Sequence, residues 1–277
     1  MQDAFAYCAE LVRTADRDRY LATLFAPAQH RAALHALYAF NLEVARVREA
    51  AHQPMPGEIR LQWWREVING ERDGEAQANP VAAALLTTMA RDRLPPDKLT
   101  ALIEARRFDL YDEPMATIAG LEAYASKTSA AVIALAAQIL GADAGAAAEP
   151  SGIAYGIGRL LRAFPLHAAR HQLYVPMEIF ERFQIRVGDV LSGQSSAKLE
   201  AALAALRDIA RRHLRAADEH VMALPHQALP AFLPVALVRP SLDLLDRCDA
   251  FAPAELALWR RQWLIWRAAR NPAWIAG

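Results

Sequence analysis

The clearest candidate for chemistry in this sequence is a basic run within a stretch that has no acidic residue. No Asp or Glu lies between Pro150 and Met177. The run consists of Arg159, Arg162, His167 and Arg170, with Tyr174 shortly after it. Guanidinium groups bind phosphate and carboxylate through paired N–H donors, so these residues predict an anion-binding site. The alternative is that the arginines pair with acids of other helices and only support the fold.

A second group of polar side chains lies in the first fifth of the chain. It comprises Tyr38, Asn41, Glu43, Arg46 and Glu49. Carboxylates four residues apart share a helix face, and facing pairs of them can hold Mg²⁺ against a diphosphate. Glu43 and Glu49 are six residues apart and face different sides of a helix. The sequence therefore predicts no metal and no cofactor, with Tyr38 and Asn41 as wall residues of a ligand cavity.

Composition limits the class of protein. The chain of 277 residues balances 31 Lys and Arg against 31 Asp and Glu, so we expect no overall field that draws it to nucleic acid or to an anionic bilayer, and any basic patch must be local. Cys8 and Cys248 have no ligand spacing, which argues against a zinc site and a disulfide framework. From the acids that begin at Asp3 we expect no targeting signal at the N-terminus, and the longest apolar stretches, 128–140 and 224–238, are shorter than the ~20 residues of a membrane span. We expect a cytoplasmic protein whose alanine- and arginine-rich usage is typical of bacteria.

The hydrophobic pattern is helical throughout. Apolar residues recur at spacings of three and four, and β-branched alternation is scarce, so we expect no strands. Proline, glycine and periodicity place helices at about 56–68, 80–90, 95–110, 121–140, 151–165, 197–223, 230–246 and 255–270. Gly156 and Gly158 lack the preceding strand of a dinucleotide site and indicate close helix packing instead. The sequence predicts an all-α bundle of roughly ten helices in a single domain over residues 1–277.

Several segments resemble the squalene/phytoene synthase family. The run LFAPAQHRAALHALYAFNLEVARVRE is similar to the helix of that family that precedes and carries an aspartate motif, and LPHQALPAFLPVALVRPSLDLLD is similar to its C-terminal helices. The similarity extends from about Tyr20 to Asp246. It implies a prenyl-synthase-like bundle with a central cavity. NLEVARVRE, GEIRLQWWREVI and LLRAFPLHAARHQLYVPMEI resemble in particular the subgroup of complex I assembly factors and its bacterial relatives.

The first functional motif departs from the family pattern. Where the family has its first aspartates, this chain has Ala45, Arg46 and Glu49, so that only one acid remains. The small hydroxyl residues that family members present to diphosphate near the N-terminus are replaced around residues 16–19. One carboxylate is a poor cage for an ion that requires octahedral geometry.

The second motif departs in the same way. Where the family has its second pair of aspartates, this chain has Ala163 and His167. Arg162 and the Tyr174-Val175-Pro176 segment are retained. Without magnesium, ionising a prenyl diphosphate loses several kcal/mol of transition-state stabilisation. The departures therefore imply a pseudoenzyme.

Tryptophan marks two further segments. Trp63 and Trp64 could meet a partner or a lipid surface, but at least one member of such a pair is expected in the core. Residues 255–270 carry Trp259, Trp263 and Trp266 among four arginines. A basic, aromatic helix is a candidate for contact with a membrane surface. The alternative is a docked C-terminal helix.

The resemblance and the residues together give the expected function. We expect a non-catalytic protein that assists assembly of respiratory NADH:quinone oxidoreductase, with complex I subunits or assembly intermediates as partners and a prenyl or lipid-like ligand in the cavity. One alternative is an Mg²⁺-dependent isoprenoid transferase, which requires carboxylates to converge from Glu43, Glu49, Glu104 and Asp109. The other is a lipid-binding module, peripheral to the inner membrane, that acts through the C-terminal helix.

Overall fold

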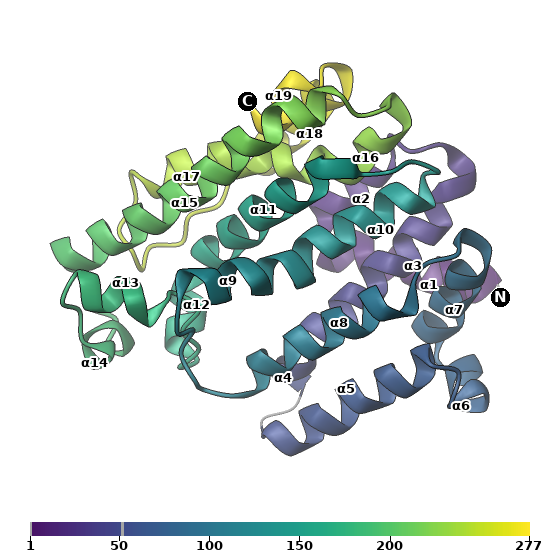
Figure 1. Cartoon of the computed structure of the whole chain (residues 1–277), viewed down its shortest axis with the longest axis horizontal. Helices are drawn as coiled ribbons and strands as arrows, with labels where there is room; N and C mark the ends of the chain where they lie inside the picture. The colour runs from purple at the N-terminus through teal and green to yellow at the C-terminus, as the bar shows by residue number, and fades with distance from the viewer. Residues whose placement is uncertain (1, 51–52) are drawn as a thin grey trace. The chain divides into compact units, whose positions relative to one another are not determined.

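The computed structural model describes residues 2–50 and 53–277, and every regular element among them is a helix (Figure 1). The chain divides into two compact units that interleave along the sequence. Unit 1 comprises Met1–Tyr111, Ala131–Gly145 and Leu224–Leu233, and unit 2 comprises Asp112–Ala130, Ala146–Ala223 and Pro234–Gly277. The all-α prediction is confirmed, whereas the single domain and the central cavity stay predictions.

Unit 1 is organised around α3 (Ala28–Ala45). Every residue from Ala33 to Leu42 in this helix is buried, which is typical of a helix at the centre of a core. It packs against α1 (Gln2–Ala15), α7 (Pro80–Asp92) and α10 (Ala131–Ile139). The remaining elements of this unit are α2 (Arg17–Thr23), α4 (Val47–Ala50), α5 (Pro54–Ile68), α6 (Asp73–Ala78), α8 (Pro96–Arg106), η1 (Arg107–Leu110), η4 (His226–Ala228) and α16 (Leu229–Phe232).

Unit 2 is organised around α11 (Ala148–Arg162). This helix packs against α15 (Ala197–Met222), α9 (Ile118–Ala125), the π-helical segment η2 (Ser126–Ala130) and α17 (Val238–Leu245). The other elements are α12 (Phe164–Ala169), α13 (Met177–Arg182), α14 (Val187–Leu191), α18 (Leu258–Arg270) and α19 (Ala273–Ala276). Two 3₁₀ turns, η3 (Gly145–Ala147) and η5 (Leu233–Leu237), lie at the boundaries of the units.

The glycines of α11 allow its backbone to approach η2 closely. A Cβ added at Gly152 would lie 2.1 Å from the Cα of Ala130, and one added at Gly156 would lie 2.9 Å from the Cβ of Ala125. Contacts this short exclude any side chain at the two positions. A Cβ at Gly158 would meet Val238 at 3.2 Å. The prediction that Gly156 and Gly158 serve close packing is confirmed.

Three predicted helices are divided in the structure, and the segment 95–110 is α8 followed by the 3₁₀ turn η1. The segment 121–140 is α9, η2 and α10 in succession, because the π-helical turn interrupts the α-helical hydrogen bonds. The segment 230–246 is α16, η5 and α17, since Pro230, Pro234 and Pro240 lack the N–H that a continuous helix needs. The structure has 19 α-helices among the described residues rather than roughly ten, because of these divisions and because short helices such as α2, α6 and α14 lie outside the predicted ranges.

One stretch of the described chain, His226–Leu245, is long and apolar enough to cross a membrane by length and composition. Its mean hydropathy is 1.4, and 72% of its most apolar window is buried inside the protein. The length expected for this stretch was wrong, because the apolar turns continue beyond Val238 as α17. Buried core helices of this composition pass the same test, so the stretch is weak support for a membrane span.

Candidate functional site

Tyr38 and Asn41 lie in the buried part of α3, and each is 2% exposed. The guanidinium carbon of Arg19 on α2 lies 5.0 Å from the centre of the Tyr38 ring. The amide oxygen of Asn41 is buried without a hydrogen-bond donor. A buried acceptor in that state costs about 1–3 kcal/mol, which a bound water or ligand hydroxyl would offset.

The start of α2 holds buried charges that the sequence analysis did not identify as such. Asp16, Asp18 and Arg19 are all buried. Asp16 caps α2, because its carboxylate accepts a hydrogen bond from the backbone N–H of Arg19 at 3.2 Å. Its other oxygen lies 3.6 Å from Nη1 of Arg19. The sequence contains one signal for this arrangement, an Asp at a helix start with an Arg three residues later. This pattern predicts a helix cap, but it does not show that Asp16 and Arg19 are buried.

Glu43 and Glu49 each lie beside an arginine. The Oε2 of Glu43 accepts a hydrogen bond at 2.6 Å from Nη2 of Arg60 on α5. Arg46 follows the last residue of α3, and its Nε lies 4.0 Å from Oε2 of Glu49 on α4. The spacing predicted that the two glutamates face different sides of one helix; in the structure they belong to two helices, because α3 ends at Ala45.

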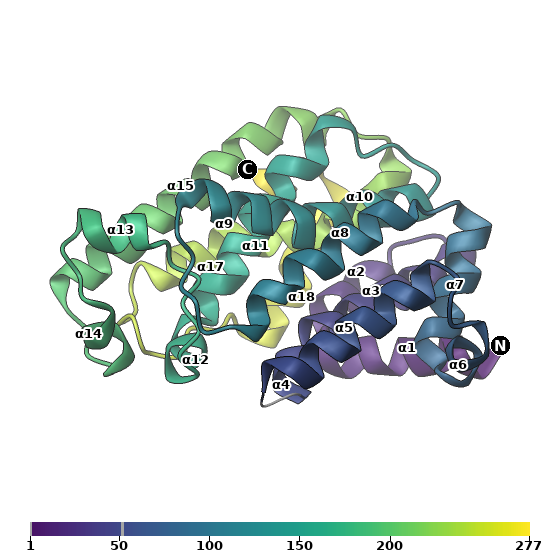
Figure 2. The same cartoon turned by 60° about the horizontal axis from the view of Figure 1, so that its bottom comes forward.

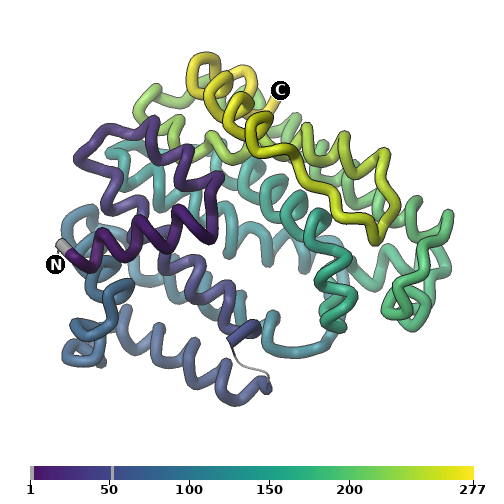
Figure 3. Tube along the Cα trace, turned by 180° about the vertical axis from the view of Figure 1, so that it is seen from behind, coloured from purple at the N-terminus to yellow at the C-terminus, as the bar shows by residue number. Residues whose placement is uncertain are grey.

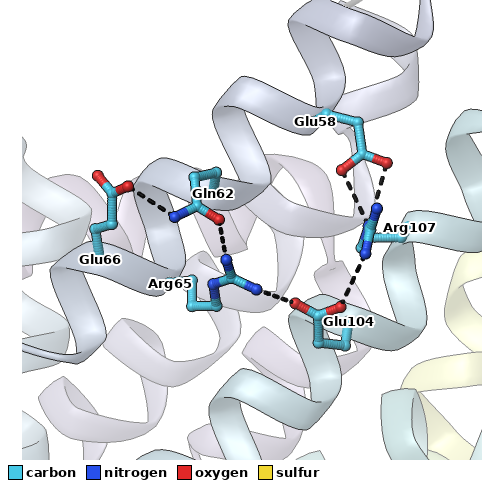
Figure 4. Close-up of polar contacts among 6 residues, drawn as sticks. All are labelled: Glu58, Gln62, Arg65, Glu66, Glu104 and Arg107. Atoms are coloured by element: carbon cyan, nitrogen blue, oxygen red, sulfur yellow. Dashed lines mark hydrogen bonds and ion pairs between the residues drawn. The ribbon is translucent and has the colours of Figure 1, made fainter.

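Glu104 belongs to a ladder of polar contacts between α5 and α8, which lie side by side (Figure 2). Arg65 donates to Glu104 at 2.8 Å, and Arg107 lies 3.4 Å from the other oxygen of the same carboxylate. Figure 4 shows how the ladder continues. Arg107 donates to both oxygens of Glu58, at 3.1 and 3.0 Å, Arg65 donates to the side-chain oxygen of Gln62, and Gln62 donates to Glu66 at 2.7 Å.

Asp109 completes the set of acids that the transferase alternative requires, and its Oδ2 lies 3.1 Å from Nη1 of Arg106. All four carboxylates therefore have a guanidinium within 4.0 Å. Arginines therefore balance the negative charge of these carboxylates. In a magnesium site the carboxylates would instead bind the ion. No group of three or more His, Cys, Asp or Glu side chains is placed to hold a metal ion in the part of the chain that the structure describes.

The basic run of the sequence lies at the junction of α11 and α12 in unit 2. Arg159 and Arg162 occupy the last turn of α11, His167 lies in α12, and Arg170 follows the end of α12. The first three are partly exposed and Arg170 is exposed. Positive side chains also stabilise the negative end of a helix dipole, so the two arginines of α11 have a role in the fold as well.

His167 and Tyr174 lie against each other, with ring centres 4.6 Å apart, and the Tyr174 ring is 5.7 Å from that of Tyr124. They border a cavity of about 10 Å³, which has room for about one water molecule. Its lining comprises Leu121, Leu160, Leu161, Phe164, His167, Tyr174, Val175 and Leu206. His167 stands where the resembled family has an aspartate of its second motif. Its imidazole lies among apolar and aromatic side chains, which are poor ligands for Mg²⁺.

The structure brings the predicted residues together in two sets. Tyr38, Asn41, Glu43, Arg46 and Glu49 lie on α3, α4 and the residue between them in unit 1. Arg159, Arg162, His167, Arg170 and Tyr174 lie on α11, α12 and the segment that follows in unit 2. Trp64 is 1% exposed and stacks edge-on against Phe40, which confirms that one of the paired tryptophans is core.

Comparisons with protein-family models and with known proteins place similar sequences in the family that the sequence motifs indicated. The family model for squalene/phytoene synthase matches residues 12–267. "NADH dehydrogenase (ubiquinone) complex I, assembly factor 6" of Rattus norvegicus is 30% identical over 250 residues, which cover 89% of this chain and 75% of that protein. The 15-cis-phytoene synthase of Synechocystis sp. is 22% identical over 262 residues, covering 89% of this chain and 77% of that protein.

A solved structure of a dehydrosqualene synthase in complex with ligand matches the fold. Its TM-score is 0.85 at 17% identity, over 98% of this chain and 97% of that chain. The likeness agrees with the prenyl-synthase-like architecture expected from the sequence. Since the family model also matches most of its length, this chain belongs to the squalene/phytoene synthase family.

Proposed function

We propose that this protein assists assembly of respiratory NADH:quinone oxidoreductase and does not itself catalyse prenyl transfer. The observation that carries the non-catalytic part is the pairing of Glu43, Glu49, Glu104 and Asp109 with arginines. Ala45, Ala163 and His167 stand at the other positions where the family pattern has aspartates. Loss of the magnesium ions removes the charge compensation that a departing diphosphate needs.

The role in assembly is supported by the relatives. Complex I assembly factor 6 of rat and of human are each 30% identical to this chain, and the chain spans about three quarters of their length. The phytoene synthase relative is more distant, at 22% identity. The proposal makes complex I subunits or assembly intermediates the partners, and places the protein in the cytoplasm beside the inner membrane.

Deletion of the encoding gene from its host should lower the NADH:quinone oxidoreductase activity of isolated membranes, and the wild-type gene should restore it. Succinate dehydrogenase activity of the same membranes is the control, because a general defect of the respiratory chain would lower both. Native gels of these membranes should show loss of the complete enzyme rather than an inactive enzyme of full size. An unchanged NADH:quinone oxidoreductase activity would contradict the assembly role.

The transferase alternative requires a separate measurement on the purified protein. With farnesyl and geranylgeranyl diphosphate and excess Mg²⁺, we expect no release of diphosphate above background. A phytoene synthase with its aspartates intact serves as the positive control. Turnover by this protein would overturn the non-catalytic part of the proposal and require metal ligands other than those named here.

The basic run of unit 2 gives a third measurable expectation. We propose that Arg159, Arg162, His167 and Arg170 bind the anionic head group of a prenyl or lipid-like ligand. The wild-type protein should bind inorganic diphosphate in a calorimetric titration, and Arg162→Ala should abolish this binding because a guanidinium clamp is lost. Arg186→Ala is the matched control, as the side chain of Arg186 is 85% exposed and pairs with Asp189 on α14. Equal binding by the Arg162→Ala and wild-type proteins would remove the run from the proposed site.

A further inference from the structure

The C-terminal helix α18, in the yellow segment of Figure 3, has two opposite faces of different character. At 100° per residue, Leu264, Ile265 and Ala268 fall within an arc of about 100°, and all three are buried. Trp259, Trp263, Trp266 and Arg270 fall within about 60° of one another on the other side. These four residues, which we call the Trp/Arg face, are all exposed.

The exposure of the three indoles is large for their size. Trp259 is 70% exposed, Trp263 46% and Trp266 44%. The face is a straight stripe about 16 Å long, since eleven rises of about 1.5 Å separate Trp259 from Arg270. Apolar surface of this extent is costly to leave in water, so an aligned row of indoles marks a contact surface rather than scattered exposure.

Arginines stack on two of the three indoles of this face and add charge beside them. The guanidinium of Arg267 lies 4.3 Å from the ring centre of Trp263 and 3.6 Å from that of Trp274, the exposed tryptophan of α19. The guanidinium of Arg270 lies 4.2 Å from the Trp266 ring. Such stacking presents positive charge at the level of the rings and reduces the loss of side-chain freedom on binding.

The charge of α18 is of one sign. The helix contains four arginines and no acidic residue, although the whole chain has a formal net charge of zero. Indoles are amphipathic and prefer the boundary between water and hydrocarbon, while each basic side chain near an anionic bilayer is attracted to it. Aromatic residues with arginines beside them are the composition of helices that lie in a membrane interface.

We propose that the Trp/Arg face of α18 docks this protein on the surface of an anionic phospholipid bilayer. The indoles enter the headgroup region, and Arg260, Arg267 and Arg270 meet lipid phosphates. A plane of lipid fits a straight stripe of equivalent side chains, whereas a protein hot spot concentrates its aromatic anchors in a central pocket. The inference goes beyond the assembly role and does not rest on it, because it depends only on α18 and α19.

The test is sedimentation of the full-length protein with vesicles. Vesicles of phosphatidylcholine and phosphatidylglycerol should carry the protein down, and vesicles of phosphatidylcholine alone should carry much less. Trp259→Ala/Trp266→Ala should lower the partition coefficient at least about tenfold, because two indoles are removed. Arg270→Gln should lower it about fivefold, and raising the salt concentration should weaken binding of the wild type.

The matched control is Ile59→Ala, which removes an exposed apolar side chain, 66% exposed, from α5 of unit 1. This variant should bind as the wild type does. Quenching of wild-type tryptophan fluorescence by brominated phosphatidylglycerol tests the same contact without any substitution, so a variant that fails to fold does not decide the result. Absence of wild-type binding to anionic vesicles overturns the proposal. Binding that survives Trp259→Ala/Trp266→Ala, or capture by a complex I subunit in place of lipid, also overturns it.

Discussion

Gly152→Ala lowers the free energy of unfolding by about 3 kcal/mol, since overpacking of a core costs about 1–3 kcal/mol and more when nothing can move. The added Cβ would lie 2.1 Å from the Cα and 2.4 Å from the backbone nitrogen of Ala130. Both are backbone atoms, so a change of rotamer cannot relieve the contact. α11 and η2 must move apart instead. For a protein of this size we expect the melting temperature to fall by about 10 °C, measured by circular dichroism.

Gly188→Ala is the matched control for that measurement. Gly188 lies in α14, is exposed, and a Cβ added there meets nothing within 4 Å. Alanine in a helix is favoured over glycine by roughly 0.5–1 kcal/mol, so this variant should melt at the same temperature as the wild type or slightly above it. If the two variants melt together, the close approach of α11 to η2 is not a constraint on the fold.

We expect the stability of the wild-type protein to fall by about 3 kcal/mol between pH 6.5 and 4 through the single residue His35. Burial lowers the pKa of His35 from 6.5 to about 4, and repulsion from Arg31 adds to the effect. The unfolded chain therefore binds a proton in this range that the folded protein does not bind. The contribution of neutral His35 is complete above pH 6.5 and is lost as the pH falls toward 4.

Variants at position 35 separate this effect from the titration of other groups. The His35 ring stacks on Tyr20 with ring centres 5.5 Å apart, and its Nε2 is buried without a hydrogen-bond partner. His35→Phe can keep the stacking and cannot titrate, and His35→Gln cannot titrate either. In urea unfolding series from pH 4 to 7, both variants should show a flatter dependence of stability on pH than the wild type. Three parallel curves would mean that His35 is protonated equally in the folded and unfolded states.

Much of the helical pattern could be predicted because local signals mark the ends of the helices. Asn79 and Pro80 are an example, since the Asn79 side chain accepts from the backbone N–H groups of Val81 and Ala82 at 2.9 and 3.1 Å where α7 begins. The π-helical turn in η2 could not be predicted. It packs where α11 has glycines some twenty residues later in the chain, and this contact is tertiary rather than local.

The candidate site was predictable in its residue types and less so in its environments. The sequence analysis identified the absence of aspartates and the basic run, because both follow from residue identity alone. It did not predict that Arg19 would be buried beside Tyr38, or that His167 would lie against Tyr174, since burial depends on which helices meet. The ion pairs of Glu43 with Arg60 and of Glu104 with Arg65 were not predicted either, because the partners lie 17 and 39 residues apart in the chain.

The interleaved order of the two units has a consequence for biosynthesis. Unit 1 takes its last segment, Leu224–Leu233, from near the end of the chain, and α16 of this segment packs against α2 and α10. At about 5–20 residues per second, the ribosome needs on the order of ten seconds to reach α16 after it has made the first 111 residues. The surfaces of α2 and α10 that α16 covers stay open until α16 has been made. Unit 1 can therefore complete its core only after most of the chain has left the ribosome, and contacts of such long sequence separation favour slow folding.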